Sequence, residues 1–158
     1  LTYQGDGDIA SIGCAEIIHA AARNEKITTI FVNNGVYGMT GGQMAPTTLP
    51  NQVTATSPRG RDTSLTGMPV KLSEMIAVLP VAYVARGSVH NPASIKKTKS
   101  YIKKAIQAQV DKEGFSMVEV LAPCPTNWHL SPLASMERIE QEVIPYYTPG
   151  ELVKKEGV

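Results

Sequence analysis

The sequence is poor in several features that would each define a class of protein. Its 158 residues include only two cysteines, so no disulfide framework is expected and a reducing compartment is favoured. No apolar run is long enough to cross a bilayer, and nothing at the start resembles a signal peptide. The net charge of +1 favours neither a nucleic acid nor an acidic partner. These absences predict a cytoplasmic protein that binds neither membrane nor nucleic acid.

The length and the apolar content are those of one globular domain. An apolar fraction of 42% is ordinary, and a chain of this length can bury a real core. Internal repeats and low-complexity tracts are absent from the sequence. We therefore expect a single domain over residues 1–158.

A glycine-rich turn, Gly5-Asp6-Gly7-Asp8, follows a predicted strand over Leu1–Gln4. An apolar helix is expected over Ala10–Arg23, and a β-branched strand over Ile27–Val32 leads into Asn33-Asn34-Gly35-Val36. A helix of ~14 residues rises roughly 20 Å, and a strand of ~6 residues returns by a similar distance. The turn and the asparagines should therefore meet at the carboxyl ends of neighbouring parallel strands, where open α/β sheets bind ligands.

The residue types at this edge suit a magnesium ion that holds a diphosphate. Magnesium usually takes one or two carboxylates, keeps water and shares substrate phosphates. Asp6 offers a carboxylate, Asn34 an amide oxygen and Val36 a backbone carbonyl. Gly5 and Gly7 let the backbone approach phosphates closely, and the first turn of the following helix suits an anion.

The rest of the chain alternates between helices and strands, which predicts an α/β fold with a mostly parallel sheet and helices on both faces. The tail Tyr146–Gly150 is too polar and too short to form a core alone. The expected elements are a helix over Leu72–Leu79, a strand over Val81–Ala85, a helix that Asn91-Pro92 begins and Gly114 ends, a strand over Phe115–Leu121 and a helix over Pro132–Val143.

Helical spacing predicts which faces are buried. The expected stripes are Ile12, Ala15, Ile18 and Ala22 in the first helix, and Ile95, Tyr101 or Ile102, Ile106 and Val110 in the helix after Asn91. Cys14 and His19 are expected to pack in the core or on the helix surface. The second helix also carries five lysines, which form either a solvated face or a docking patch for an acidic electron carrier: Lys96, Lys97, Lys99, Lys103 and Lys104.

The segment Tyr37–Met68 has no periodicity and is rich in glycine, proline, threonine and serine. Loops of this length usually serve a function, and its place after Asn34 puts it over the predicted site. Because its large apolar residues are few, we expect the part from Thr40 to Met68 to be the least ordered when nothing is bound. Within it, Arg59, Arg61 and Asp62 either bind an anion or pair with one another.

Several motifs of the sequence resemble those of a known family. Gly5-Asp6-Gly7 followed by Asn33-Asn34 is the motif of the thiamine diphosphate fold family. The longer strings resemble the β subunit of 2-oxoacid:ferredoxin oxidoreductases, nearest the 2-oxoglutarate type, over nearly the whole chain. These strings run from Gly5 to Gly13, from Asn33 to Gln43, from Ser57 to Arg61 and from Glu119 to Trp128.

The resemblance implies a thiamine diphosphate-binding domain with Mg²⁺ on Asp6, Asn34 and the Val36 carbonyl. Asp8 is expected to cap the first helix or hold the turn rather than touch the metal. The residues that the resemblance places along the cofactor are Gly5, Asp6, Gly7, Asp8, Asn34, Val36, Tyr37, Gly38, Met39 and Thr40.

The resemblance also makes Cys124 one of four cysteines that bind a 4Fe-4S cluster. The other three would lie in an earlier segment that carries a Cys-x-x-Cys, and the chain starts at Leu1 without an initiator methionine. We therefore expect a C-terminal fragment that is inactive alone and in which Cys124 is accessible. Neither Trp128 nor His129 is assigned a role.

The implied reaction is oxidative decarboxylation of a 2-oxoacid to acyl-coenzyme A, with reduction of ferredoxin. An α subunit would supply the pyrimidine half of the site and its activating glutamate, and γ and δ subunits stay open. The alternatives are a non-oxidative thiamine enzyme such as a decarboxylase or a synthase half, a dinucleotide-binding module, and a non-catalytic interaction domain. The dinucleotide fingerprint needs an acidic residue at the end of the second strand, where this chain has Asn33-Asn34. The identity of the 2-oxoacid is left open.

Overall fold

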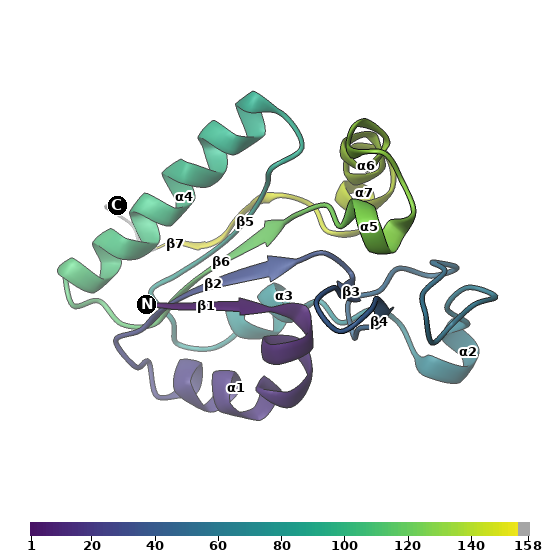
Figure 1. The fold of residues 1–158 in the computed structure, drawn as a ribbon. Coiled ribbons are helices and arrows are strands. Elements are labelled where there is room, and N and C mark those ends of the chain that lie inside the picture. Colours follow the sequence, from purple (N-terminus) through teal and green to yellow (C-terminus); the bar gives the residue numbers. More distant parts are fainter. Residues whose placement is uncertain (155–158) are drawn as a thin grey trace.

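The computed structural model describes residues 1–154, so residues 155–158 of the expected domain lie outside it. A five-stranded sheet runs through the molecule in the order β1-β2-β6-β5-β7 (Figure 1). Four strands are parallel, and β7 joins the edge antiparallel to β5. The strands are β1 Thr2–Gly5, β2 Thr28–Asn33, β5 Tyr83–Ser88, β6 Ser116–Leu121 and β7 Gly150–Lys154. The mostly parallel α/β fold expected from the sequence is confirmed.

Helices cover both faces of this sheet. In Figure 1, α4 (Pro92–Val110) lies across one face, and α1 (Cys14–Ala22) and α3 (Leu72–Ala77) lie on the other. Successive strand residues point to opposite faces, so Phe31 packs toward α1 and Ile30 toward α4. Within residues 1–154, no helix combines the length and the apolar character needed to cross a membrane.

A third group of elements lies beyond the carboxyl ends of the parallel strands (Figure 1). Several of these elements pack around an apolar cluster of their own, in which Val36, Leu121 and Ile139 are fully buried. The elements are β3 Val36–Tyr37, β4 Gln43–Met44, α2 Thr63–Thr66, α5 Pro125–Trp128, α6 Pro132–Arg138, the π-helix η2 Ile139–Val143 and α7 Ile144–Tyr146.

The first helix is divided, and its predicted buried stripe is wrong. A π-helix, η1 (Asp8–Ile12), precedes α1, and the N–H of Gly13 bonds to the carbonyl of Asp8 at 2.7 Å. This i to i+5 bond shifts the helical phase, so the stripe cannot continue across Gly13. Ile12 is 88% exposed, Ala15 and Ala22 are exposed and Ile18 is half-buried; Ile9, Ala10, Ile17 and Ala21 are buried instead.

The long helix α4 begins as predicted, with the Asn91 side chain accepting from the N–H of Ser94 at 2.8 Å. Its predicted stripe is only partly right, because Tyr101 is buried whereas Ile106 and Val110 are exposed. The buried face consists of Thr98, Tyr101, Ala105 and Ala108. Its small side chains let the helix approach the sheet so closely that a Cβ on Gly87 would overlap Thr98.

The bounds of one predicted strand are wrong. The strand predicted at Val81–Ala85 is observed at Tyr83–Ser88, and it continues through Arg86, which is 1% exposed. Arg86 can lie inside because its Nε donates to Glu119 at 2.7 Å and its Nη2 to Glu74 at 2.6 Å. The polar tail also joins the core, since Tyr147 is 1% exposed and β7 pairs with β5.

The segment after Asn34 is more regular than the sequence suggested. The strands β3 and β4 form an antiparallel hairpin, and α2 begins at the Asp62 cap, which accepts from the N–H of Ser64 at 2.9 Å. Arg61 bonds to backbone carbonyls rather than to Asp62. It is 4% exposed and donates to the carbonyls of five residues: Ala45, Pro46, Thr48, Thr66 and Gly67. Hydrogen bonds from Arg61, rather than large apolar side chains, therefore fix the conformation of this segment.

Candidate functional site

An open pocket of about 720 Å³ lies at the carboxyl ends of β1 and β2. The two strands are parallel neighbours with Gly5 opposite Val32, so the turns that follow them meet at one edge of the sheet. All ten residues predicted to lie along a cofactor line this pocket: Gly5, Asp6, Gly7, Asp8, Asn34, Val36, Tyr37, Gly38, Met39 and Thr40. Residues from both turns therefore line the same pocket.

Asp6 is the buried acid of this pocket, with 3% of its surface exposed. Its Oδ1 accepts from the N–H of Gly7 at 3.1 Å, and its Oδ2 accepts from the hydroxyl of Thr47 at 2.8 Å. Burial raises the pKa of Asp6 from 3.8 to about 6, against the opposing effect of these neutral donors and of the Gly35 N–H. A carboxylate in this setting would gain from a cation in the pocket.

The Asn33–Val36 turn carries the other two predicted metal ligands. The Asn34 Oδ1 accepts from the N–H of Val36 at 3.1 Å, which fixes the side chain against its own turn. Gly35 has a φ of +70°, a backbone conformation that favours glycine. An amide oxygen has a second lone pair, so Asn34 can still act as a metal ligand.

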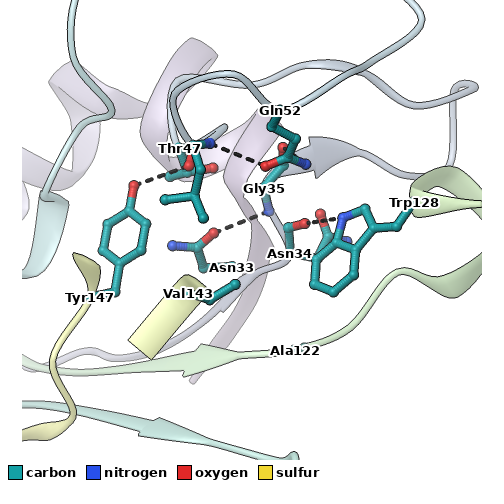
Figure 2. Close-up of a pocket in the computed structure, with 10 residues that line it drawn as sticks. Asn33, Asn34, Gly35, Thr47, Gln52, Ala122, Trp128, Val143 and Tyr147 are labelled. Carbon is teal, nitrogen blue, oxygen red and sulfur yellow. Dashed lines mark hydrogen bonds between the residues drawn. The ribbon is translucent and has the colours of Figure 1, made fainter. Parts of the chain in front are cut away.

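The back of this turn is held by side chains that the sequence analysis did not identify (Figure 2). Asn33 Nδ2 donates to Glu119 at 2.7 Å, and Asn33 Oδ1 accepts from the N–H of Gly35. Trp128 Nε1 donates to the Asn34 carbonyl at 3.1 Å. Asn33, Asn34, Gly35 and Trp128 help to line a cavity of about 10 Å³, which is about the size of one water molecule.

A signal for this buried support was present in the sequence. Glu119 sits in the middle of an apolar strand, and Arg86 follows another apolar run. Charged residues are almost never fully buried unless they are paired. Two opposite charges at matching positions of neighbouring strands therefore indicate a buried ion pair, and Arg86 lies opposite Glu119 in the sheet.

Asp8 was expected either to cap the first helix or to hold the turn, and the cap is not formed. Gly7 occupies the cap position of η1 without a side-chain bond, and the Asp8 carboxylate accepts from Gln4 Nε2 at 3.0 Å instead. The π-helical turn begins at Asp8 itself, so its side chain cannot reach back as a cap would. Asp8 still lines the pocket, where it holds the end of β1 through Gln4.

The glycines and the hairpin shape the wall of the pocket. A Cβ on Gly7 would lie 2.6 Å from Cδ1 of Tyr37, so only glycine fits against that ring. The Tyr37 hydroxyl donates to Ser11 at 3.0 Å, which ties the hairpin to η1. Met39 and Thr40 are exposed at the rim.

Cys124 lies beside this wall at the start of α5. It is half-buried, as the prediction of an accessible thiol requires, and a Cβ on Gly38 would lie 3.4 Å from its Sγ. Asn127 Nδ2 donates both to the Cys124 sulfur, at 3.2 Å, and to the Gly38 carbonyl, at 2.9 Å. His129 ends α5 in a left-handed conformation with a φ of +54°.

The part of the chain that the structure describes does not assemble a metal cluster site of its own. No group of three or more His, Cys, Asp or Glu side chains lies together within residues 1–154. The other cysteine, Cys14, is half-buried against the core beneath α1, and His19 is exposed on that helix. Cys124 can therefore contribute one thiolate, and a four-cysteine cluster does not fit the described residues alone.

Comparisons with known proteins show the family to which the chain belongs. Residues 1–120 match the family model of the thiamine pyrophosphate enzyme, C-terminal TPP binding domain, and the chain belongs to that family. A 2-oxoglutarate:ferredoxin oxidoreductase from Magnetococcus marinus, solved with 2-oxoglutarate, coenzyme A and succinyl-CoA bound, has a similar fold with a TM-score of 0.71. The match has 26% identity and covers 98% of this chain and 56% of that one.

Sequence relatives narrow the class further. The ketoisovalerate oxidoreductase subunit VorA of Methanothermobacter marburgensis is 53% identical over 80% of this chain and 27% of its own length. The 2-oxoglutarate synthase subunit KorB of Archaeoglobus fulgidus is 36% identical over 89% of this chain and 49% of its own length. The chain thus spans between about a quarter and a half of these relatives, and the sequence does not single out the 2-oxoglutarate type.

Proposed function

We propose that this chain is the cofactor-binding part of a 2-oxoacid:ferredoxin oxidoreductase, in which its pocket holds thiamine diphosphate and Mg²⁺. The observation that carries the proposal is the convergence of Asp6, Asn34 and Val36 on one pocket at the carboxyl edge of the sheet. Relatives named as a ketoisovalerate oxidoreductase subunit, a 2-oxoglutarate synthase subunit and a 2-oxoacid:ferredoxin oxidoreductase subunit beta align with 80%, 89% and 77% of this chain. The pocket itself lies within residues 1–120, which match the thiamine pyrophosphate-binding family model. The activity proposed is oxidative decarboxylation of a 2-oxoacid to acyl-coenzyme A.

The residues present fit the cofactor and its ion. Asp6 supplies a buried carboxylate whose hydrogen bonds come from neutral donors, which is the setting that a hard divalent cation stabilises. Asn34 and the Val36 carbonyl supply two neutral oxygens. Gly5 leaves open space on the pocket side, since a Cβ there would meet no atom within 4 Å.

When bound, thiamine diphosphate supplies the electron sink for decarboxylation of a 2-oxoacid. The work of this chain is to bind and orient it. Asp6, Asn34 and Val36 would hold the ion and thereby the diphosphate, while Tyr37, Gly38, Met39 and Thr40 would line the thiazolium side. Tyr37 is fixed by Ser11, so that wall is formed before the cofactor enters.

Partners would complete the site. We propose an α subunit that brings the pyrimidine half of the pocket and its activating glutamate, and ferredoxin and coenzyme A as acceptors. Cys124 would give one thiolate to a 4Fe-4S cluster whose other ligands lie outside residues 1–154. The single domain over residues 1–158 and a cytoplasmic location belong to the same proposal.

The substrate is proposed only as a class, the 2-oxoacids. The relatives' names include both ketoisovalerate and 2-oxoglutarate enzymes, and the former relative shares 53% identity against 36% for the latter. A non-oxidative thiamine enzyme would use Asp6 and Asn34 equally but would have no need of Cys124. An iron–sulfur absorbance spectrum of the assembled enzyme separates these two functions.

Replacing Asp6 tests the proposal. We expect Asp6→Asn to weaken Mg²⁺-dependent binding of thiamine diphosphate by a hundredfold or more, roughly 3 kcal/mol, because it removes the charged ligand. The measurement is calorimetric titration of the assembled enzyme with the cofactor in the presence and absence of Mg²⁺. Asp111→Asn, an exposed carboxylate at the end of α4, is the control and should bind normally. Unchanged binding in Asp6→Asn would contradict the proposal.

A further inference from the structure

We propose that Thr47 is a positioning residue that aims the Asp6 carboxylate at the cation, an inference that rests on the proposed function. Thr47 belongs to the Ala45–Thr48 turn, which the sequence placed in an irregular loop. Its side chain is 1% exposed, and its hydroxyl donates to Asp6 Oδ2 at 2.8 Å. Asp6 lines the pocket and Thr47 does not, so the hydroxyl bonds to the carboxylate from outside the pocket lining.

The Asp6 carboxylate has few other restraints. Its Oδ1 accepts from the N–H of Gly7, the next residue in the chain, at 3.1 Å. That donor shares the backbone of Asp6, whereas Thr47 comes from a different segment and fixes the plane of the carboxylate. Without the Thr47 hydroxyl, rotation about the Cβ–Cγ bond would be opposed by backbone N–H groups, those of Asp6, Gly7 and Gly35.

The Ala45–Thr48 turn is itself held at every carbonyl. Arg61 Nη1 donates to the carbonyls of Ala45, Pro46 and Thr48, at 3.4, 3.0 and 2.6 Å. The fourth carbonyl, that of Thr47, lies 3.1 Å from the Tyr147 hydroxyl (Figure 2). That hydroxyl has one hydrogen, which it can donate to Thr47 or to the Val70 carbonyl, also at 3.1 Å. Burial raises the pKa of Tyr147, so its hydroxyl stays protonated and keeps this donor role. A turn anchored in this way presents the Thr47 side chain in one orientation.

The same turn also contacts the segment that carries the other metal ligands. The Thr48 hydroxyl donates to the Gly35 carbonyl at 2.6 Å, between Asn34 and Val36. Adjacent residues of one turn therefore bond to the two segments that supply the predicted ion ligands. The distance between Asp6 and the Asn34–Val36 segment is thus set by the Ala45–Thr48 turn as well as by the pairing of β1 with β2.

Groups that hold a metal ligand from outside typically change metal affinity by about 10–100-fold when they are removed. We therefore expect Thr47→Val, which keeps the side-chain shape and loses the hydroxyl, to weaken ion binding about tenfold. Thr47→Ser keeps the hydroxyl and should restore most of the affinity. At saturating ion the turnover number should recover in Thr47→Val, because the reacting atoms are untouched.

The probe is Mn²⁺, titrated into the assembled enzyme with thiamine diphosphate and followed by electron paramagnetic resonance. The matched control is Thr54→Val, because Thr54 is also buried, at 5% exposed, and its hydroxyl bonds only to Ser57 within a local turn. Melting temperatures of all variants separate a loss of fold from a loss of affinity. Thr54→Val should bind Mn²⁺ as the natural enzyme does.

The outcomes separate this inference from the proposed function. Weaker Mn²⁺ binding in Thr47→Val, with normal binding in Thr47→Ser and Thr54→Val, supports the positioning role. If Asp6→Asn loses Mn²⁺ and Thr47→Val keeps it, the positioning role is wrong and the proposed function stands. If the natural enzyme binds no Mn²⁺ in this pocket, the proposed function itself fails and takes this inference with it.

Discussion

Two buried carboxylates near the sheet edge differ in what surrounds them. Glu119 is paired with Arg86 inside the protein, at 2.7 Å, and also accepts from Asn33 and Ser73. Asp6 is buried nearly as deeply, yet its bonds come from a hydroxyl and from backbone N–H groups. A buried charge is costly unless it is paired, and Glu119 has its partner inside the protein. The neutral donors around Asp6 are consistent with its proposed role as the ligand of a cation from outside.

Gly5 offers a test of the pocket that leaves the fold alone. A methyl group there would meet no atom within 4 Å, but Gly5 lines the pocket. We expect Gly5→Ala to change the free energy of unfolding by less than about 0.5 kcal/mol and to weaken thiamine diphosphate binding about tenfold. Thermal melting without cofactor and calorimetric titration with it give the two numbers.

Gly150→Ala is the matched control for that substitution. Gly150 also has open space around an added Cβ, and it lies in β7, outside the pocket. It should leave cofactor affinity unchanged. Equal affinities in Gly5→Ala and Gly150→Ala would mean that the cofactor does not occupy the Gly5 side of the pocket.

Sequence reasoning found the residues that face the pocket and missed those behind it. Gly5, Asp6 and Asn34 lie in a motif whose spacing follows from the dimensions of one strand-helix-strand unit. Asn33, Trp128 and Glu119 act through contacts between segments some ninety residues apart, which local spacing does not encode. Thr47 was missed for the same reason, because its hydrogen-bond partner Asp6 lies 41 residues earlier in the chain.

The conformation of the segment after β4 depends on one buried side chain, that of Arg61. Arg61 closes it by donating to five carbonyls, and a lysine has a single nitrogen that cannot reach them all. We expect Arg61→Lys to destabilise the protein by about 2–4 kcal/mol, because buried carbonyls lose their donors. Hydrogen exchange should speed up at the amides of residues 45–67 more than in the sheet.

Arg59→Lys is the control, because Arg59 is exposed two residues away. It should change neither the stability nor the exchange rates. The expectation that the Thr40–Met68 loop is the least ordered part of the unliganded chain can be read from the same experiment. Loop amides that exchange as slowly as those of β6 would count against that expectation and in favour of the Arg61 anchor.

The elements themselves were largely predictable, and the errors have local causes. Strands and helices alternate with the expected periods, so the sheet and both helical layers follow from the sequence. The phase of the first helix was wrong because the π-turn before Gly13 breaks the 3.6-residue period. The strand β7 was missed because an edge strand exposed on one side carries a weak apolar signal, with none of its residues fully buried.

At the scale of the whole molecule, one edge of the sheet combines a cofactor-sized pocket, a buried acid and a nearby thiol. Two elements near the carboxyl ends of the strands support these groups. Helix α5 places Cys124 next to Gly38, and the segment that ends at Tyr147 bonds to the Ala45–Thr48 turn. Tyr3, Ile12 and Met39 leave apolar surface exposed on the rim of the pocket. Under the proposed function, the α subunit would cover that surface and exclude water from the reaction.

The most direct test of the central claim is the position of the ion in the assembled enzyme. Crystals grown with thiamine diphosphate and Mn²⁺ can be measured at a wavelength where manganese scatters anomalously. We predict an anomalous peak in the pocket, about 2.1 Å from the Asp6 carboxylate, the Asn34 amide oxygen and the Val36 carbonyl. A peak bound by other residues, or cofactor density with no ion beside Asp6, would contradict the account.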